Sequence, residues 1–171
     1  EFRYRDPILT RNTLVIAISQ SGETMDTLMA LRHAKEQRAR ILAICNVNGS
    51  TIPRESDAVI YTHAGPEVAV ASTKGFLTQV VAVQILALYL AQVRGYTWDE
   101  EIRAGVRELE KMPEKVDLVL DSIDPVRAVA RDLVDAKAIL FLGRHVGYPV
   151  ALEGALKLKE ISYIHAGGYP A

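Results

Sequence analysis

The hydrophobic pattern at the start of the chain changes period once, at a polar turn. Residues 14–18 (LVIAI) are apolar and mostly β-branched, and the turn Ser19 to Thr24 follows them. Residues 25–34 then carry apolar side chains at spacings of three and four. The first pattern predicts a strand buried on both faces, as in a parallel sheet, and the second predicts a helix.

Strand and helix patterns continue to alternate as far as residue 94. Residues 41–47 and 57–62 predict two more strands, and the Asn-Gly and Pro content of 48–56 predicts a loop between them. Residues 67–94 predict one long helix, apolar nearly all round, which we expect to be buried under a sheet or at a subunit interface. Its most apolar part, 80–91, is short for a membrane span and contains Gln84. The alternation predicts an α/β fold: a three-layer αβα arrangement with a parallel sheet.

The pattern after residue 95 is different. Residues 96–123 predict charged amphipathic helices that break at Met112-Pro113, and we interpret 96–124 as a linker. A helix at 126–134, a strand at 138–142 and a helix at 150–164 follow, with Pro149 as the first helical residue. Only one strand is predicted after the linker, and one strand cannot make a sheet, so we expect the chain to be a slice of a larger protein. We expect one domain over 1–95 and a second, only begun, over 125–171.

Composition narrows the class of protein. The 171 residues are 49% hydrophobic and carry a net charge of -1, so nothing favours nucleic acid or an anionic membrane as a partner. The only cysteine, Cys45, lies in a predicted strand and is expected to be a structural thiol in a reducing compartment. The start, EFRYRDPIL, lacks the apolar core of a signal peptide, so we expect a cytoplasmic protein.

The turn at residues 19–24 is a candidate phosphate site. Ser19, Ser21 and Thr24 can donate hydrogen bonds, Gly22 lets the backbone approach a ligand, and the predicted helix N-terminus attracts anions. The alternative is a plain helix cap, which uses the same residue types. The number of hydroxyls and the position at the end of a buried strand favour a ligand. Glu23 would repel phosphate and is assigned to capping.

The motifs missing from this turn indicate the kind of ligand. The sequence has neither the GxxxxGK[ST] spacing of a nucleotide P-loop nor the GxGxxG of a dinucleotide site. A sugar phosphate therefore remains as the expected ligand. We expect no metal and no cofactor.

A second candidate constellation lies in the predicted helix 150–164. Glu153, Lys157 and Glu160 are spaced so that they fall within an arc of about 60°. The alternative is an exposed stripe with an i,i+4 ion pair. Apolar neighbours on both sides favour a cleft, in which a carboxylate could act as the base of an aldose-ketose isomerisation and a lysine could keep it ionised.

Several of these segments together resemble a known family. They are EFRYR, LVIAISQSGET with TLMALR, EVAVASTKGF, and FLGR followed by YPVALEGALKLKEISYIHA. They are similar to the isomerase part of the glucosamine-6-phosphate synthases, the isomerising glutamine:fructose-6-phosphate aminotransferases, which is built from two sugar isomerase (SIS) domains. The resemblance runs nearly end to end.

The resemblance implies an activity and residue roles. The family makes glucosamine 6-phosphate and glutamate from fructose 6-phosphate and glutamine, with ammonia channelled from a glutaminase domain, and homodimers are expected. Matching motifs imply that Glu160 shuttles the proton between the first two sugar carbons, that Lys157 assists it, and that Glu153 is a further acidic position. They also imply sugar-phosphate contacts by Ser19, Gln20, Ser21, Thr24, Val70 and Ser72.

The departures from the family lead to further expectations. We expect the glutaminase domain, an upstream strand and the region after Ala171 to be missing, so the 171 residues alone should show negligible turnover. Gly167 replaces the glutamate usual in the family. A non-catalytic sugar-phosphate-binding regulatory module on the same scaffold is the alternative function, although such a sensor has no use for the Glu153, Lys157 and Glu160 face.

Overall fold

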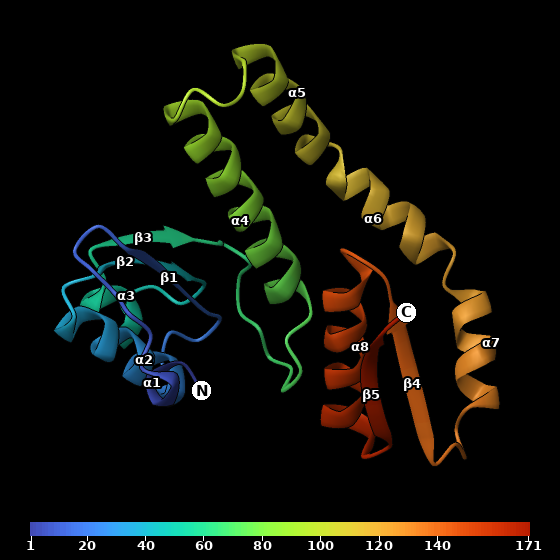
Figure 1. Ribbon diagram of the computed structural model, residues 1–171. Coiled ribbons are helices and arrows are strands. Elements are labelled where there is room, and N and C mark those ends of the chain that lie inside the picture. The colour runs from blue at the N-terminus through green and yellow to red at the C-terminus, as the bar shows by residue number, and fades with distance from the viewer. The chain divides into compact units, whose positions relative to one another are not determined.

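The computed structural model describes residues 1–171, which form two compact units (Figure 1). The first unit comprises residues 1–68 and 72–98, and the second comprises 69–71 and 99–171. The helices that were predicted as a linker therefore group with the second unit. The domain boundaries proposed from the sequence, 1–95, 96–124 and 125–171, stay predictions.

The first unit is a parallel sheet with helices on both faces. Its elements are α1 (Phe2–Arg5), β1 (Leu14–Ser19), α2 (Met25–Glu36), β2 (Arg40–Cys45), α3 (Thr51–Glu55), β3 (Ala58–Tyr61) and α4 (Lys74–Val93). The strand order is β1-β2-β3, with Ile16 opposite Leu42 and Ile44 opposite Ile60. This confirms the predicted α/β class with a parallel sheet.

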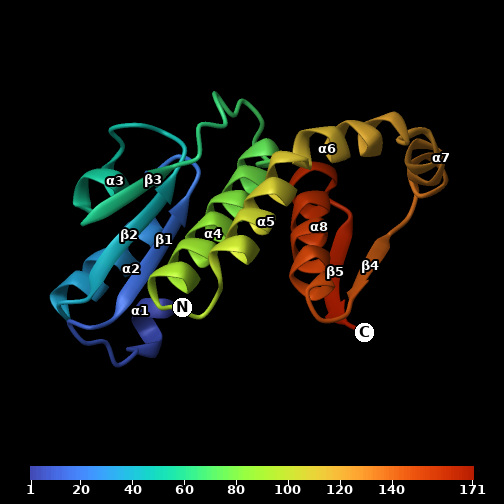
Figure 2. The ribbon, with the colours of Figure 1, turned by 90° about the horizontal axis from the view of Figure 1, so that it is seen from above.

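Two clusters of buried side chains define the layers of this unit. One lies between the sheet and helices α2 and α3, and its most buried members include Leu31, Ile41 and Ile52. The other lies on the opposite face, where Ala82 and Leu86 of α4 pack on β2. Figure 2 shows α2 and α3 on one side of the strands and α4 on the other. The αβα layering predicted from the sequence is therefore present.

Three sequence predictions in this unit are corrected, one about burial and two about the bounds of helices. Strand β1 is not buried on both faces: Ile16 and Ile18 are about two-fifths exposed because β1 is an edge strand and α4 packs on β2. Helix α4 begins at Lys74 rather than residue 67. Much of its apolar surface away from β2 is exposed in the single chain, and its burial at a subunit interface stays a prediction. The expected loop 48–56 contains α3, in which Pro53 lies in the first turn, where proline is tolerated.

Helix α4 is longer than its most apolar part, 80–91, which is short for a membrane span. The helix has 20 residues and is apolar enough to cross a membrane by length and composition alone. One side of α4 packs on β2, as expected of a helix that covers a sheet. The prediction that membranes are not a partner stays a prediction.

The second unit holds three helices, then a strand, a helix and a strand. They are α5 (Asp99–Glu110), α6 (Met112–Asp121), α7 (Asp124–Asp132), β4 (Ala138–Gly143), α8 (Gly147–Ser162) and β5 (His165–Pro170). None of the residues of α5, α6 and α7 is buried. Helix α8 packs on both strands, and Ala151 and Ala155 are buried on its inner face.

The second unit contains a strand that sequence patterns did not predict. Strand β5 pairs with β4 in parallel, with Ala138 opposite His165 and Gly143 opposite Pro170. Two glycines and a proline are poor strand formers, so propensity argues against this strand. Tertiary packing outweighs propensity, because β5 pairs with β4 along its length and packs on α8. Glycine is required at position 168, where a Cβ would lie only 2.9 Å from the Cα of Leu152 in α8. The expectation of a single strand after the linker was wrong.

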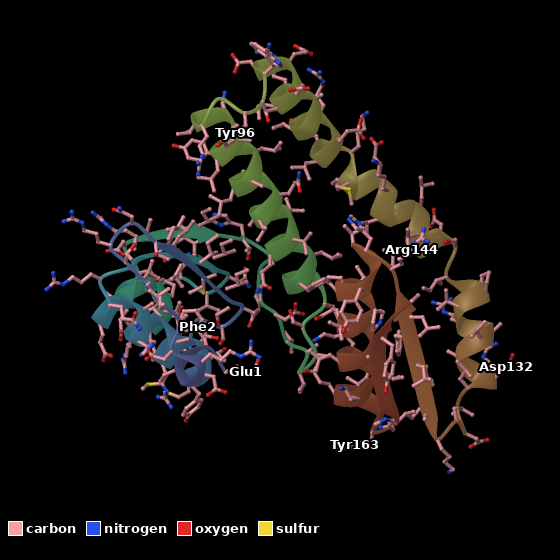
Figure 3. The ribbon with its side chains drawn as sticks, in the orientation of Figure 1. Glu1, Phe2, Tyr96, Asp132, Arg144 and Tyr163 are labelled. Atoms are coloured by element: carbon pink, nitrogen blue, oxygen red, sulfur yellow. The ribbon has the colours of Figure 1, made fainter.

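The ends of α8 also depart from the prediction. The helix begins at Gly147, two residues before Pro149, because the amides of Gly147 and Tyr148 donate to the carbonyls of Arg144 and His145. At the other end, Tyr163 adopts a left-handed conformation with φ of 60° and is exposed (Figure 3). This residue turns the chain from α8 into β5.

Candidate functional site

The turn between β1 and α2 has the geometry expected of an anion site. The Ser19 side chain is buried, its Oγ accepts a hydrogen bond from the Gly22 amide at 3.0 Å, and it lies 3.2 Å from Thr24 Oγ1. Thr24 is the N-cap residue of α2 but makes no side-chain capping bond. The first amides of α2 are thus left uncapped by side chains, as an anion site at a helix N-terminus requires.

Gly22 lets the turn close on its neighbours. Its φ is +69°, in the left-handed region that favours glycine. A Cβ here would overlap Ser50 Oγ and lie 2.8 Å from Cys45 Sγ, and both of those residues are buried. The sequence singled out Gly22 for backbone approach to a ligand, and the structure shows a second reason for glycine, the packing of the turn against β2 and the loop after it.

Glu23 caps a helix, as predicted, but the helix is α3. Its carboxylate accepts a hydrogen bond of 2.7 Å from the amide of Thr51, the first residue of α3. Hydrogen bonding to Thr51 is the largest cause that lowers the pKa of Glu23. The carboxylate therefore joins the turn to the loop after β2. Ser21 Oγ accepts a bond of 3.2 Å from the Glu23 amide, which orders the same turn.

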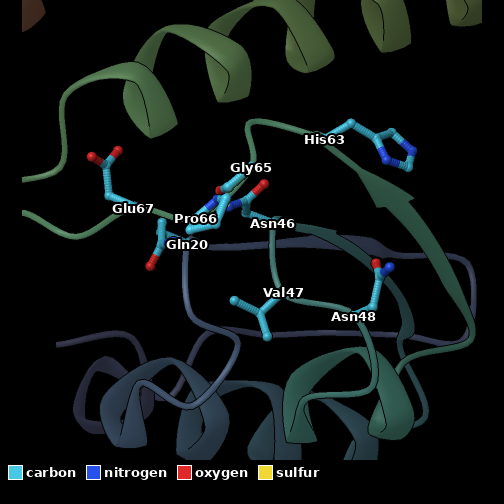
Figure 4. A pocket seen from close by; sticks show the side chains of 8 residues that line it. All are labelled: Gln20, Asn46, Val47, Asn48, His63, Gly65, Pro66 and Glu67. Carbon is cyan, nitrogen blue, oxygen red and sulfur yellow. The ribbon is translucent and has the colours of Figure 1, made fainter.

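A cavity of about 520 Å³ lies beside the turn, at the carboxyl ends of β1, β2 and β3. It is lined by Gln20, Asn46, Val47, Asn48, His63, Gly65, Pro66 and Glu67 (Figure 4). The carboxyl ends of parallel strands are where open α/β sheets bind ligands. Of the predicted site residues, only Gln20 is among those that line this cavity.

The predicted sugar-contacting residues differ in their surroundings. The Oγ of Ser72 is buried and has no hydrogen-bond partner. A buried polar atom without a partner is costly, so this hydroxyl is a candidate to bond a ligand. Ser72 and Gln20 both lie against Gly75, because a Cβ at Gly75 would be 2.7 Å from Ser72 Oγ and 3.2 Å from Gln20 Cγ. Val70 is almost fully exposed, and its sugar contact stays a prediction.

Asn46 and Glu67 are two of the seven lining residues that were not selected from the sequence. Asn46 directly follows β2, just as Gln20 directly follows β1, and this shared position after a strand was a signal that could have found it. Glu67 was placed in the helix, but it lies before α4 and accepts bonds from the Gly75 amide at 2.9 Å and the Thr73 amide at 3.3 Å. The Gly75 bond is the largest cause that lowers the Glu67 pKa.

The second unit holds the charged face of α8. Lys157 Nζ lies 2.9 Å from Glu160 Oε2 and 3.5 Å from Glu153 Oε1, which confirms that the three side chains share one face. Each side chain is between a quarter and about a third exposed. Desolvation by burial lowers the pKa of Lys157, but hydrogen bonds and charge from Glu160 and Glu153 outweigh it, and the net pKa is raised.

The charged face of α8 is less enclosed than expected. Val150, Leu156 and Ile161 were predicted to frame a cleft, yet all three are exposed. A helix that packs on only two strands leaves its remaining apolar side chains in solvent. The charged triad itself is confirmed as a cluster, whereas its enclosure in a cleft stays a prediction.

Comparisons with known proteins point to one family. A family model described as the SIS domain matches residues 1–89. The glutamine–fructose-6-phosphate aminotransferase (isomerizing) of Streptomyces coelicolor is 70% identical over the whole chain, which spans 28% of that protein. The enzyme of the same name from Corynebacterium diphtheriae is 63% identical, again over the whole chain and 28% of its own length.

A solved structure gives the same result. The C-terminal domain of glucosamine-fructose-6-phosphate aminotransferase from Francisella tularensis superposes with a TM-score of 0.94 at 44% identity, covering 98% of this chain and 48% of that one. A glucosamine-6-phosphate deaminase from Thermotoga maritima, 24% identical with a TM-score of 0.71, shares the fold. The match covers 100% of this chain and 50% of the deaminase chain.

Proposed function

Because the chain belongs to the SIS domain family, we propose that it binds fructose 6-phosphate and supplies isomerase machinery to an isomerising glutamine–fructose-6-phosphate aminotransferase. The product of that reaction is glucosamine 6-phosphate. The chain spans 28% of the curated relatives named above. A glutaminase domain that supplies ammonia, a second copy of the subunit and a cytoplasmic location belong to the same proposal.

The phosphate is proposed to bind at the turn between β1 and α2. The observation that carries this step is the uncapped N-terminus of α2, reached through a turn of three hydroxyl residues. Backbone amides at a helix N-terminus favour a dianion without any bound cation. Ser19, Ser21 and Thr24 would add hydroxyl donors once their present bonds within the turn rearrange.

The sugar is proposed to extend from the phosphate toward Gln20 and Ser72. The buried Ser72 hydroxyl has an unused donor and an unused acceptor, and a sugar hydroxyl can satisfy both. The Gln20 side-chain amide offers both a donor and an acceptor at the edge of the cavity. Val70 is proposed as an apolar contact to the sugar on the strength of the resemblance alone.

Proton transfer is assigned to the charged face of α8. Glu160, as carboxylate, would take a proton from one of the first two sugar carbons and return it to the other through an enediol. Lys157 Nζ donates a hydrogen bond of 2.9 Å to Glu160 Oε2 and would orient this carboxylate toward the sugar. Lys157 would also attract the negative charge that develops on the sugar oxygen. Glu153 would help to keep Lys157 protonated, consistent with its raised pKa.

Calorimetric titration tests the binding step. We expect the whole chain to bind fructose 6-phosphate and not phosphate-free fructose. Ser21→Ala should weaken binding about tenfold, because a hydrogen bond to a charged group contributes about 1.5–3 kcal/mol. Ser122→Ala, which removes an exposed hydroxyl bonded only to the Val119 carbonyl, is the matched control and should leave binding unchanged. Equal affinity for fructose and its phosphate would refute the proposal.

The alternative, a regulatory module that binds without chemistry, needs a different measurement. Exchange of sugar-carbon protons with deuterated solvent reports proton transfer directly. In a preparation that turns over fructose 6-phosphate, Glu160→Gln should abolish this exchange and keep sugar-phosphate binding. Unchanged exchange in that variant would remove Glu160 from the proposed chemistry.

A further inference from the structure

The side chain of Asn46 joins the loops that follow β2 and β3. Its Oδ1 accepts hydrogen bonds from Thr62 Oγ1 at 3.1 Å and from the Ala64 amide at 2.8 Å. Its Nδ2 donates to the Gly65 carbonyl at 2.8 Å. Its own backbone amide donates to the Gln20 carbonyl at 3.2 Å, in the loop after β1. One residue therefore connects three loops at the carboxyl edge of the sheet.

The loop that Asn46 holds leads directly to the start of α4. Two residues after Gly65, the Glu67 carboxylate accepts bonds from the Thr73 and Gly75 amides. Thr73 is the N-cap residue of α4 and makes no side-chain cap of its own. Glu67 thus replaces the cap, and its position depends on the loop in which it lies. Figure 4 shows Asn46 next to Gly65 and Pro66, with Glu67 below the first turn of α4.

The start of α4 is also where two proposed ligand residues meet. Ser72 Oγ, Glu67 Oε2 and Gln20 Cγ all lie within 3.2 Å of where a Cβ of Gly75 would be. The unpartnered Ser72 hydroxyl therefore has its position set by the segment that Glu67 anchors. A small displacement of this segment would move Ser72 relative to Gln20.

We infer that Asn46 is a positioning residue of the sugar-binding side of the site. Its amide fixes the loop 62–67, that loop delivers Glu67 to the amides of Thr73 and Gly75, and the anchored segment holds Ser72 beside Gln20. The inference rests on the proposed function for the identity of the ligand. Asn46 acts only through these bonds and touches no reacting atom.

Two kinds of variant test this inference. Asn46→Ala removes all three side-chain bonds, and Thr62→Val removes only one while keeping the shape of the side chain. Thr62→Ser retains the hydroxyl and should behave like the unchanged chain. Asn12→Ala is the matched control, because Asn12 is exposed, precedes β1 at the opposite edge of the sheet and is not among the residues that line the cavity.

The first readout is amide hydrogen exchange on the whole chain without ligand. We expect Asn46→Ala to speed exchange of the Gly75 amide at least about fivefold, with a smaller effect for Thr62→Val, because the acceptor Glu67 is no longer held in place. The Gly22 amide, which donates to Ser19 Oγ, should not change. A general loss of stability would speed both amides, so the comparison separates positioning from unfolding. If Asn46→Ala does not fold, Thr62→Val decides.

The second readout is affinity for fructose 6-phosphate. Asn46→Ala should lower it at least about tenfold and Thr62→Val about threefold, and Asn12→Ala and Thr62→Ser should leave it within twofold. Unchanged Gly75 exchange overturns the inference, and so does faster exchange with unchanged affinity. Failure of the unchanged chain to bind fructose 6-phosphate overturns the proposed function instead, and the exchange data still show whether Asn46 holds the start of α4.

Discussion

Gly22→Ala should destabilise the first unit by clearly more than the same change at Gly49. Both glycines have φ near +70°, so an alanine at either site costs about 1–2 kcal/mol for the left-handed conformation. Loss of freedom in the unfolded chain offsets this by about 0.4–1 kcal/mol. At Gly49 nothing lies within 4 Å of the added Cβ, so the net cost there is about 1 kcal/mol.

At Gly22 the added methyl group also has to displace buried atoms. Ser50 Oγ cannot swing away freely, because it donates to the Val47 carbonyl at 2.8 Å and lies 3.6 Å from Cys45 Sγ. Overpacking of this kind costs about 1–3 kcal/mol. We therefore expect Gly22→Ala to lower the free energy of unfolding by about 1–3 kcal/mol more than Gly49→Ala does.

The single cysteine provides the assay. Cys45 lies in the core of the first unit and is fully buried, so its reaction with a thiol reagent across a urea series follows unfolding of that unit and not of the second. The dependence of the free energy of unfolding on urea should be the same for the unchanged chain, Gly22→Ala and Gly49→Ala, because the change affects packing and not the extent of unfolding. Equal urea midpoints for the two variants would show that the turn is not packed against Ser50 and Cys45 as described.

Two further predictions concern pH. The pKa of Glu67 is lowered in the folded chain, so Glu67→Gln should be less stable than the unchanged chain near neutral pH. This difference in stability should shrink as pH falls through the folded pKa of Glu67. Urea unfolding at several acidic pH values measures it. A stability difference that does not change with pH would contradict this prediction. The pKa of Lys157 is raised, so its ion pairs should stabilise the second unit below the usual lysine pKa, and this contribution should be lost as pH rises through the folded value. The free energies of unfolding of the unchanged chain and of Lys157→Met should therefore converge at the highest pH. A difference in free energy that persists there would argue against the ion pairs.

The sequence predicted those parts of the fold and site in which short-range pattern decides the structure. The strand 14–18, the turn after it and the helix that follows were found because their periodicities differ sharply. The face of Glu153, Lys157 and Glu160 follows from helix geometry alone. In each of these, residues close in sequence determine one another's positions.

The features that were missed depend on residues distant in sequence. Strand β5 forms through its pairing with β4 and its packing on α8, where Gly168 allows a close approach to Leu152, and local propensity records none of this. The start of α4 is at Lys74 because Glu67 folds back onto the Gly75 amide instead of continuing the helix. The exposure of β1 depends on which strand α4 covers. Tertiary packing thus decided the cases in which local patterns gave a wrong boundary or a wrong burial.

The nearly sequential arrangement of the two units bears on how the chain folds as it is synthesised. All three strands of the first sheet lie between residues 14 and 61, and α4 ends at residue 93, before any strand of the second unit is reached. A chain emerging from the ribosome can therefore bury Leu31, Ile41 and Ile44 while β4 and β5 are still untranslated. Slow translation after residue 98 would give the first core time to form, and it would reduce incorrect pairing between strands of the two sheets.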